Sequence, residues 1–546
     1  MEKVYYNARV YTGELPLQQA FAVEEDRFCF VGTDAEALAL DAQEKIDMNG
    51  AFVCAGFIDS HMHLLNLGQT LGIAPLAQHT GSLQEMLACL HSTPPGRGGW
   101  ILGRGWNQDL FADTDRMPDR WDLDRVSIEH PVCVVRACGH ALAVNSRALE
   151  LLGITADTPQ PEGGCIGMKN GEPDGLFFDN AMDRVYAAVP VPGKDELKTM
   201  LRQACTVLNA HGITGCGSDD YCVFLELPWQ EINRAFLELE AEGGLTVRVQ
   251  EQANLTTPEA LREYIAADES LKNGNLFRAG PLKLLGDGAL GARTAYLSRP
   301  YADDPQTRGL SVFTPQEFDE LIGIAHAAGM QVAVHCIGDG CLDLVLNSLE
   351  KAQAVHPRTG CRHGIVHCQI TRPDQLERMA KAGLHIYAQS IFLDYDIHIV
   401  EQRVGTELAA SSYSWKTLLD MGCTVSNGSD CPVEAPDVLA GIQCAVTRRD
   451  LKGSGPYLEQ EAFTVQQALD SFTKAGAYAC FAEEQRGRID SGMLADFVVL
   501  GADPFAVEPS ALHSIPVLET WLGGVQVFAA QSRCRSRKRL DANTDK

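Results

Sequence analysis

The sequence predicts an α/β protein whose main body is a (β/α)8 TIM-like barrel. From about residue 200 onwards, short apolar segments alternate with amphipathic segments, and several amphipathic segments end at a glycine. This alternation is typical of a parallel sheet covered by helices. An open doubly wound sheet is the alternative, but no glycine-rich phosphate turn follows the first strand, which favours the barrel.

Eight apolar segments are candidates for the barrel strands. They are AFVCAGFIDSHMH, HGITGCGSD, GLTVRVQEQA, PLKLLGDG, QVAVHCIGD, GIVHCQ, HIYAQS and TVSNGSD. Helical patterns such as TPQEFDELIGIAHAAG and RPDQLERMAKAG lie between the later strands. We therefore expect the barrel to comprise residues 56–75 and 200–487.

Short alternating segments at both ends of the chain predict a second, smaller β structure. The same pattern of short alternating apolar stretches that end at turn residues occurs in VYYNARVYTG and QAFAVEEDRFCFVG near the start and in DFVVLGAD and VLETWLGGVQVFAA near the end. We expect residues 1–55 and 488–530 to form one composite β-sandwich. Two unrelated edge hairpins are the alternative.

A long segment separates the first two barrel strands. The first ends near His63 and the second begins near His211, which is too far for one connection. Residues 76–199 are therefore expected to form a large insertion over the catalytic face. Residues 531–546 carry six basic residues and little apolar content, so we expect a disordered, dispensable tail.

Composition and charge limit the function classes. Of the 546 residues, 45% are hydrophobic and 21% are charged, as in globular proteins, and the net charge of −27 argues against nucleic-acid binding. No run of 18 apolar residues predicts a membrane span. The 18 cysteines include no CxxC pair and the chain begins without an apolar signal core, so we expect free thiols and a cytoplasmic location.

Four histidines and an aspartate stand at the ends of candidate barrel strands. His61 and His63 are two residues apart and therefore project to the same side of a strand. His335, His367 and Asp430 each follow an apolar run directly. Singly, each histidine is more often a core or loop residue. Because the carboxyl ends of barrel strands share one face, the five together favour a metal site.

Lys283 lies between two leucines on a strand that should face inward. A buried ammonium group is costly unless it is paired. Either it pairs with a neighbour such as Asp287, or its amine has reacted with carbon dioxide to give a carbamate that bridges two metal ions. Because modified lysine is rare, the chemistry alone favours the ion pair.

Several motifs together resemble the amidohydrolase superfamily, specifically its YtcJ-like, amidohydrolase-3 branch, which includes N-substituted formamide deformylase. The motifs are GFIDSHMH, GDGALGART after Lys283, VHCIGD, GSDCPV, GHALAVNS and GRIDSGMLADFVVL, and the resemblance covers nearly the whole chain. It implies a metal-bearing barrel joined to a composite β-sandwich, and a carboxylated Lys283 that bridges metals, which reverses the preference above. The implied ligands are His61, His63, His335, His367 and Asp430. Val366 departs from the branch, which commonly has an acidic residue there.

The expected cofactor is Zn²⁺, as one or two ions, because imidazole and carboxylate ligands suit zinc; Mn²⁺ and Fe²⁺ stay open. A bound metal lowers the pKa of its water from about 15.7 toward about 7. Asp430 would accept a proton from this water and return it to the leaving amine.

Further candidates concern the substrate. His140 and Arg293 are candidate stabilisers of the developing oxyanion, and Trp106, Asn145 and Asp287 are candidate substrate contacts. A packed aromatic is the alternative for Trp106, and a turn or helix cap is the alternative for Asn145.

The leading hypothesis for the function is a hydrolase that acts on a non-peptide C–N bond of a linear amide, a formamide or an N-acyl compound. A metal-dependent deaminase or cyclic amide hydrolase is the alternative enzyme. A third hypothesis is a non-catalytic metal-binding or regulatory protein on the same scaffold, and the intact ligand set argues against it. We expect a small-molecule substrate and, by analogy, a homodimer.

Overall fold

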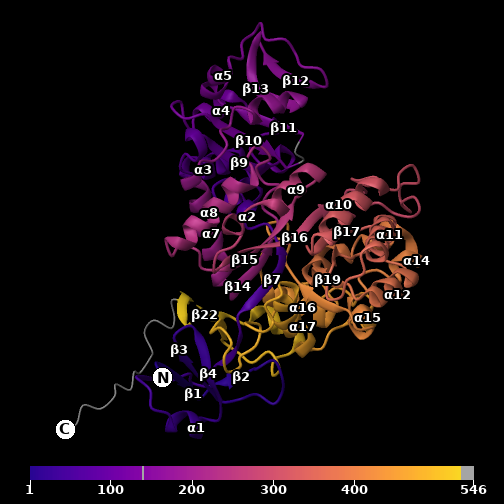
Figure 1. The fold of residues 1–546 in the computed structure, drawn as a ribbon. Coiled ribbons are helices and arrows are strands. Elements are labelled where there is room, and N and C mark those ends of the chain that lie inside the picture. The colour runs from indigo at the N-terminus through magenta and orange to yellow at the C-terminus, as the bar shows by residue number, and fades with distance from the viewer. Residues whose placement is uncertain (138–139, 531–546) are drawn as a thin grey trace, which may run out of the picture. The chain divides into compact units, whose positions relative to one another are not determined.

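The computed structural model describes residues 1–137 and 140–530, so the tail expected over residues 531–546 lies outside the described residues (Figure 1). The chain divides into two compact units. The first comprises Met1–Leu64, Cys205–Val223 and the chain from Phe236 on, and the second comprises Leu65–Ala204 and Phe224–Ala235.

The first unit contains one sheet of eight parallel strands in sequence order. The strands are β7 (Phe57–Met62), β14 (Ile213–Ser218), β15 (Arg248–Asn254), β16 (Phe277–Leu285), β17 (Val332–Cys336), β18 (Gly364–His367), β19 (His385–Ala388) and β20 (Thr424–Asn427). The first and last strands meet, since the Ser60 hydroxyl donates to the Asn427 carbonyl at 2.9 Å. The barrel prediction is confirmed, and each strand overlaps the segment expected for it, although β16 begins before PLKLLGDG, at Phe277.

Helices follow most barrel strands. They are α9 (Pro258–Ala266), α10 (Pro315–Ala327), α11 (Asp339–Val355), α12 (Pro373–Ala382), α13 (Leu393–Asp396), α14 (Val400–Ala409), α15 (Trp415–Asp420), α16 (Val438–Thr447), α17 (Val465–Ser471) and α18 (Lys474–Ala479). Helix α10 shows why they form: Thr314 and Glu317 make a reciprocal capping box, and Pro315 occupies the first turn. Its apolar side chains recur every three or four residues and are buried.

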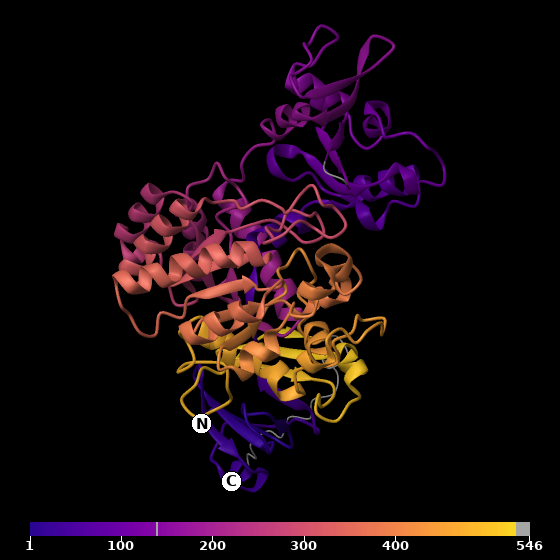
Figure 2. The same ribbon diagram turned by 90° about the vertical axis from the view of Figure 1, so that its right-hand side faces the viewer.

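The first unit contains two further sheets, and one of them combines strands from both ends of the chain. One is β4 (Arg27–Gly32), β3 (Ala20–Glu24), β1 (Lys3–Tyr6) and β5 (Glu44–Asp47), with α1 (Asp34–Ala39) beside it, and the other is β2 (Arg9–Val10), β6 (Phe52–Ala55), β21 (Phe497–Leu500), β22 (Val517–Leu522) and β23 (Val525–Ala529). The indigo N-terminal and yellow C-terminal strands lie side by side in Figure 2. Tyr5 and Phe21 stack at 4.6 Å, and Phe497 and Trp521 stack at 5.3 Å. These rings form one shared core, as a composite sandwich requires.

The second unit is built on a six-stranded sheet. Its strands are, in spatial order, β12 (Gly164–Lys169), β13 (Glu172–Asp179), β11 (Ala141–Val144), β10 (Val132–Arg136), β9 (Ile101–Trp106) and β8 (Ala74–Pro75). Its helices are α3 (Leu83–Ser92), α4 (Arg120–Asp124), α5 (Ser146–Leu152) and α6 (Asp183–Tyr186), while α2 (Leu64–Leu71), α7 (Lys194–Ala210) and α8 (Trp229–Ala241) include residues of both units. The insertion expected over residues 76–199 lies within this unit, and its place over the catalytic face stays a prediction.

Two simpler expectations concern the chain as a whole. Each cysteine in the two described ranges is a free thiol. Among the described helices, none combines the length and the apolar character that crossing a bilayer requires.

Candidate metal centre

The four histidines and Asp430 converge at the carboxyl ends of β7, β17, β18 and β20. Nε2 of His61 and Nε2 of His63 lie 3.3 Å and 3.1 Å from the same oxygen of Asp430. The ring of His367 lies 5.6 Å from that of His61 and 4.4 Å from that of His335, measured between ring centres. The structure therefore brings together all five ligands that the resemblance implies.

Two glutamines fix the rings of His61 and His367. Oε1 of Gln252, on β15, lies 2.7 Å from Nδ1 of His61, and Oε1 of Gln389, after β19, lies 2.8 Å from Nδ1 of His367. Each glutamine donates its Nε2–H to a backbone carbonyl, that of Ser60 or Tyr387, so its oxygen faces the histidine. An oxygen can only accept, so Nδ1 carries the proton and Nε2 presents a lone pair to the centre.

Backbone carbonyls orient the other two rings. The carbonyl of Asp219 lies 2.8 Å from Nδ1 of His63, which leaves Nε2 to face the centre. The carbonyl of Gly288 lies 3.1 Å from Nε2 of His335, so this ring presents Nδ1 instead. In its neutral form, each of the four imidazoles therefore offers one lone pair to the centre, and the neutral form is the one that binds a metal ion.

Sequence reasoning missed Gln252 and Gln389. The sequence does contain a signal, because both glutamines lie in or directly after an apolar barrel strand. In the structure both side chains are buried. A buried amide at the carboxyl end of a barrel strand needs a partner, and here the partner is a histidine predicted to bind metal.

Lys283 on β16 is completely buried, and within the described ranges its ammonium has no hydrogen-bond partner. Its Nζ lies 3.6 Å from one carboxylate oxygen of Asp219, while the other oxygen of Asp219 is also buried without a described partner. The Lys283 ammonium and the Asp219 carboxylate are buried with unsatisfied hydrogen-bonding atoms beside four imidazoles, and this arrangement fits a centre that a metal ion completes. The residues present therefore suit a metal.

Asp287 is not the partner of Lys283, and this expectation is corrected. Its carboxylate accepts the N–H groups of Ile337 at 3.0 Å, Gly338 at 2.8 Å and Tyr296 at 2.8 Å. One of its oxygens also lies 3.3 Å from Nε2 of His335. Three backbone donors hold this carboxylate beside the His335 ring, so it orients a predicted ligand.

Electrostatics favour neutral ligand rings at two of these positions. Burial and the nearby Lys283 lower the pKa of His61 to about 4, and burial and His335 hold the pKa of His367 well below its usual value. Burial alone would raise the pKa of Asp430, but the close ring nitrogens of His61 and His63 outweigh burial and keep that pKa well below its usual range. Asp430 is therefore a carboxylate at neutral pH.

Comparison with known proteins identifies the family. Residues 44–528 match the amidohydrolase family. The chain belongs to this family. It is 36% identical over 494 residues to YtcJ of Bacillus subtilis (strain 168), covering 89% of this chain and 90% of that protein. It is 26% identical over 538 residues to the N-substituted formamide deformylase of Arthrobacter pascens, covering 95% and 96%.

A solved structure extends this similarity to three dimensions. An uncharacterized metal-dependent hydrolase from Pyrococcus furiosus superposes with a TM-score of 0.75 at 29% identity, covering 92% of this chain and 99% of that chain. The amidohydrolase described here is thus a metal-dependent hydrolase by family, and its barrel and additional β structure fit that family.

The remaining predicted residue of the first unit, Arg293, lies after β16 and forms two hydrogen bonds to Asp303, at 3.1 Å and 2.8 Å. That carboxylate raises the pKa of Arg293. Its side chain is one-third exposed. The guanidinium is therefore held in an ion pair outside the group of ligand residues.

The other predicted residues belong to the second unit of the amidohydrolase. Trp106 is completely buried and donates its indole N–H to the Val134 carbonyl at 3.1 Å. Asn145 caps α5, because its side-chain oxygen accepts the Ala148 N–H at 2.9 Å. The structure shows the packed and capping roles that were the alternatives to substrate contact. His140 is exposed, with Nδ1 3.1 Å from a carboxylate oxygen of Asp179.

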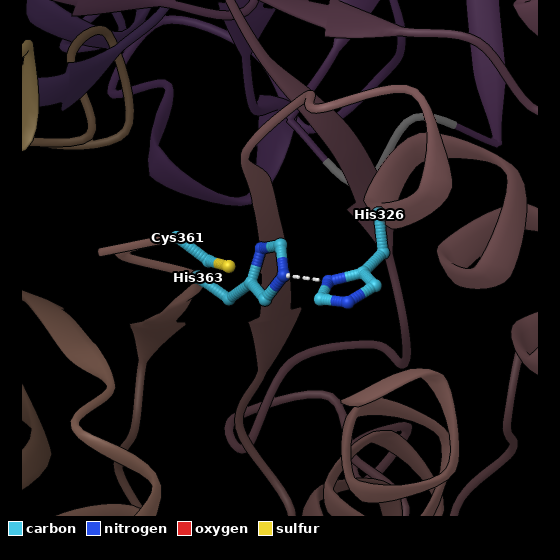
Figure 3. Close-up of side chains that lie close together, drawn as sticks. All are labelled: His326, Cys361 and His363. Atoms are coloured by element: carbon cyan, nitrogen blue, oxygen red, sulfur yellow. Dashed lines mark hydrogen bonds between the residues drawn. The ribbon is translucent and has the colours of Figure 1, made fainter. Parts of the chain in front are cut away.

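A second group of metal-ligand types lies at the opposite end of the barrel: His326, Cys361 and His363 (Figure 3). Nδ1 of His326 and Nε2 of His363 are 2.8 Å apart and share a hydrogen bond. Nδ1 of His363 accepts the Val332 N–H at 3.1 Å, and Nε2 of His326 donates to the His356 carbonyl at 2.7 Å. All four ring nitrogens are engaged, so neither ring offers a lone pair to a metal.

Proposed function

We propose that this amidohydrolase hydrolyses a non-peptide C–N bond in a linear amide, a formamide or an N-acyl compound. The observation that carries the proposal is the set of four oriented imidazole lone pairs around the Asp430 carboxylate. The formamide deformylase among the relatives supports this substrate class. The substrate is proposed to be a small molecule and the assembly a homodimer in the cytoplasm.

Zn²⁺ is the proposed cofactor, as one or two ions, because neutral imidazoles and carboxylates suit it. The residues that would hold it are His61, His63, Lys283, His335, His367 and Asp430. When bound, the metal supplies a coordinated water whose pKa falls from about 15.7 toward about 7, so that hydroxide is available at neutral pH.

Asp430 is the proposed general base and acid. Its carboxylate is ionised and is oriented by His61 and His63, so it can accept a proton from the attacking water. The same oxygen then returns the proton to the leaving amine, because expulsion of an unprotonated amide anion is unfavourable. Asp287 assists indirectly by orienting His335.

Lys283 is proposed to be carboxylated. Its Nζ would attack carbon dioxide and lose a proton, so that a neutral amine becomes a carbamate with one negative charge and two oxygens. The supporting observation is that the buried ammonium has no hydrogen-bond partner in the described part of the chain. The alternative is an ion pair with Asp219 at 3.6 Å.

A substrate screen tests the proposal. The purified protein with its metal quantified is incubated with formamides, N-acyl amino acids, cyclic imides and amino-substituted rings, while released carboxylate, amine and ammonia are measured. Release of a carboxylate and an amine from a linear amide, lost in Asp430→Asn, is expected. Turnover restricted to cyclic imides or to ring deamination would overturn the proposed substrate class.

A further inference from the structure

A cavity of about 290 Å³ opens in the first unit at the amino ends of β15 and β16. The ligand histidines lie at the carboxyl ends of the barrel strands, so this cavity is at the other end of the barrel. Its walls come from the starts of these two strands, the loop before β16 and the segment after α18. None of the proposed chemistry uses it.

The cavity is positively charged. Arg248, Arg278 and Arg486 line it, and none of its described lining residues is an aspartate or a glutamate. Asp496 neutralises Arg248 through two hydrogen bonds, at 2.7 Å and 3.0 Å. Arg278 is exposed, and neither it nor Arg486 forms a salt bridge with a described residue. Two uncompensated guanidinium groups therefore face one cavity in a protein of net charge −27.

Arg486 is the more unusual of the two. It is only 7% exposed, and its Nη1 is fully buried without a hydrogen-bond partner among the described residues. Gly215 on β14 provides the room, because a Cβ there would lie 2.6 Å from Nη1. An unsatisfied buried guanidinium nitrogen is costly unless an acceptor reaches it. An anion in the cavity would lower that cost by neutralising the charge of the guanidinium group.

The remaining lining residues suit a small anion with an apolar part. Gln250 and Asn273 present amide groups, and Leu276, Phe481 and Leu494 present carbon atoms. A volume of about 290 Å³ is at the lower edge of the range for small-molecule sites. The planar donor fork of arginine matches a carboxylate or a phosphate, each of which can accept two parallel hydrogen bonds.

We propose that this cavity is an oxyanion-binding site, separate from the metal centre, in which Arg278 and Arg486 bind a small carboxylate or phosphate. The shared chemistry is an anionic group with at least two acceptor oxygens. Binding at the amino ends of the strands involves no predicted metal ligand, so it should not require the metal.

Titration calorimetry of the metal-loaded protein tests the proposal, with inorganic phosphate and malonate as probes at low ionic strength. We expect saturable binding of at least one probe, and the tighter one shows whether phosphate or carboxylate is preferred. Arg278→Gln should weaken binding about tenfold or more, because it removes a charge-assisted contact. Arg262→Gln on α9 is the matched control, since Arg262 is exposed and does not line the cavity.

Gly215→Ala is a sharper variant because it keeps every charge. Its methyl group would displace Nη1 of Arg486, so binding should weaken although no arginine is removed. Chelation of the metal should leave the dissociation constant unchanged. The proposal is overturned if neither probe saturates, if Arg278→Gln binds as tightly as Arg262→Gln, or if binding disappears with the metal. Arg278→Gln carries the test if Gly215→Ala does not fold.

Discussion

Two groups of buried or partly buried histidines occupy opposite ends of the same barrel, and their ring nitrogens are used differently. At the carboxyl ends, each ring gives one nitrogen to an acceptor outside the centre and turns the other nitrogen toward the centre, where Asp430 lies against two of them. At the amino ends, His326 and His363 use all four of their nitrogens in hydrogen bonds to each other and to the backbone. The number of free lone pairs, and not the number of histidines, therefore distinguishes a metal site from a structural pair.

The sharpest test of this difference is Asp430→Asn. We expect turnover to fall by about 10² to 10⁴ fold with a small change in substrate binding, because the amide cannot accept the proton. His326→Gln replaces a buried imidazole at the other end of the barrel and should leave the turnover of the folded protein within a few fold. Steady-state kinetics on metal-quantified protein measures both. Near wild-type turnover in a folded, metal-loaded Asp430→Asn variant would contradict the assignment.

Lys283→Ala tests which charges complete the carboxyl-end centre. If Lys283 is carboxylated, the variant should bind fewer metal equivalents per folded molecule, and a short added carboxylic acid should partly restore metal and activity. If Lys283 is only paired with Asp219, stability should fall while metal stoichiometry stays constant. Metal analysis combined with intact mass under mild, non-acidic conditions separates the two outcomes.

Gln252→Leu and Gln389→Leu test whether the oriented lone pairs set metal affinity. Loss of either acceptor frees the ring and its tautomer, so metal affinity should fall about 10- to 100-fold. Gln331→Leu is a matched control, because Gln331 is a buried glutamine whose amide donates to the Arg362 carbonyl at the other end of the barrel. Competition with a chelator measures the affinities. Equal losses in all three variants would show a general effect of stability.

Sequence alone predicted the eight strands and the five candidate ligands that converge at strand ends, because an apolar run that ends in a histidine or an aspartate is a local pattern. It named the wrong neighbour for Lys283. Asp287 is close in sequence but is held by backbone N–H groups, whereas Asp219 follows β14 and reaches Lys283 across the barrel interior. Such a contact depends on strand order and side-chain direction, which no local pattern contains.

The predicted residues Trp106 and Asn145 show a second limit. A motif identifies residue types, but it does not tell whether their polar atoms are already used. In the structure, the indole N–H of Trp106 binds a backbone carbonyl, and the amide of Asn145 caps a helix. Whether the polar atoms are already hydrogen-bonded is also what separates the two histidine groups.

The smallest expected effect concerns pH and the amino-end pair. Burial, His326 and Arg358 lower the pKa of His363 to about 3, whereas in the unfolded chain a histidine titrates near about 6.5. Between these two pH values the unfolded state therefore binds one more proton than the folded state. The free energy of unfolding is highest above about pH 6.5 and falls by about 1.4 kcal/mol for each pH unit below it. His363→Gln removes the titrating group and with it this dependence of stability on pH.

The variant should be less stable than the wild type at pH 7.5, because Gln cannot reproduce both hydrogen bonds of the ring. By pH 5 the difference should shrink by about 2 kcal/mol, since only the wild type loses stability through this group. Urea unfolding at the two pH values, with chelator present so that metal binding does not contribute, measures the difference. An equal difference at both pH values would mean that His363 is already doubly protonated in the folded protein. The hydrogen bonds assigned to the ring nitrogens of His326 and His363 would then be wrong.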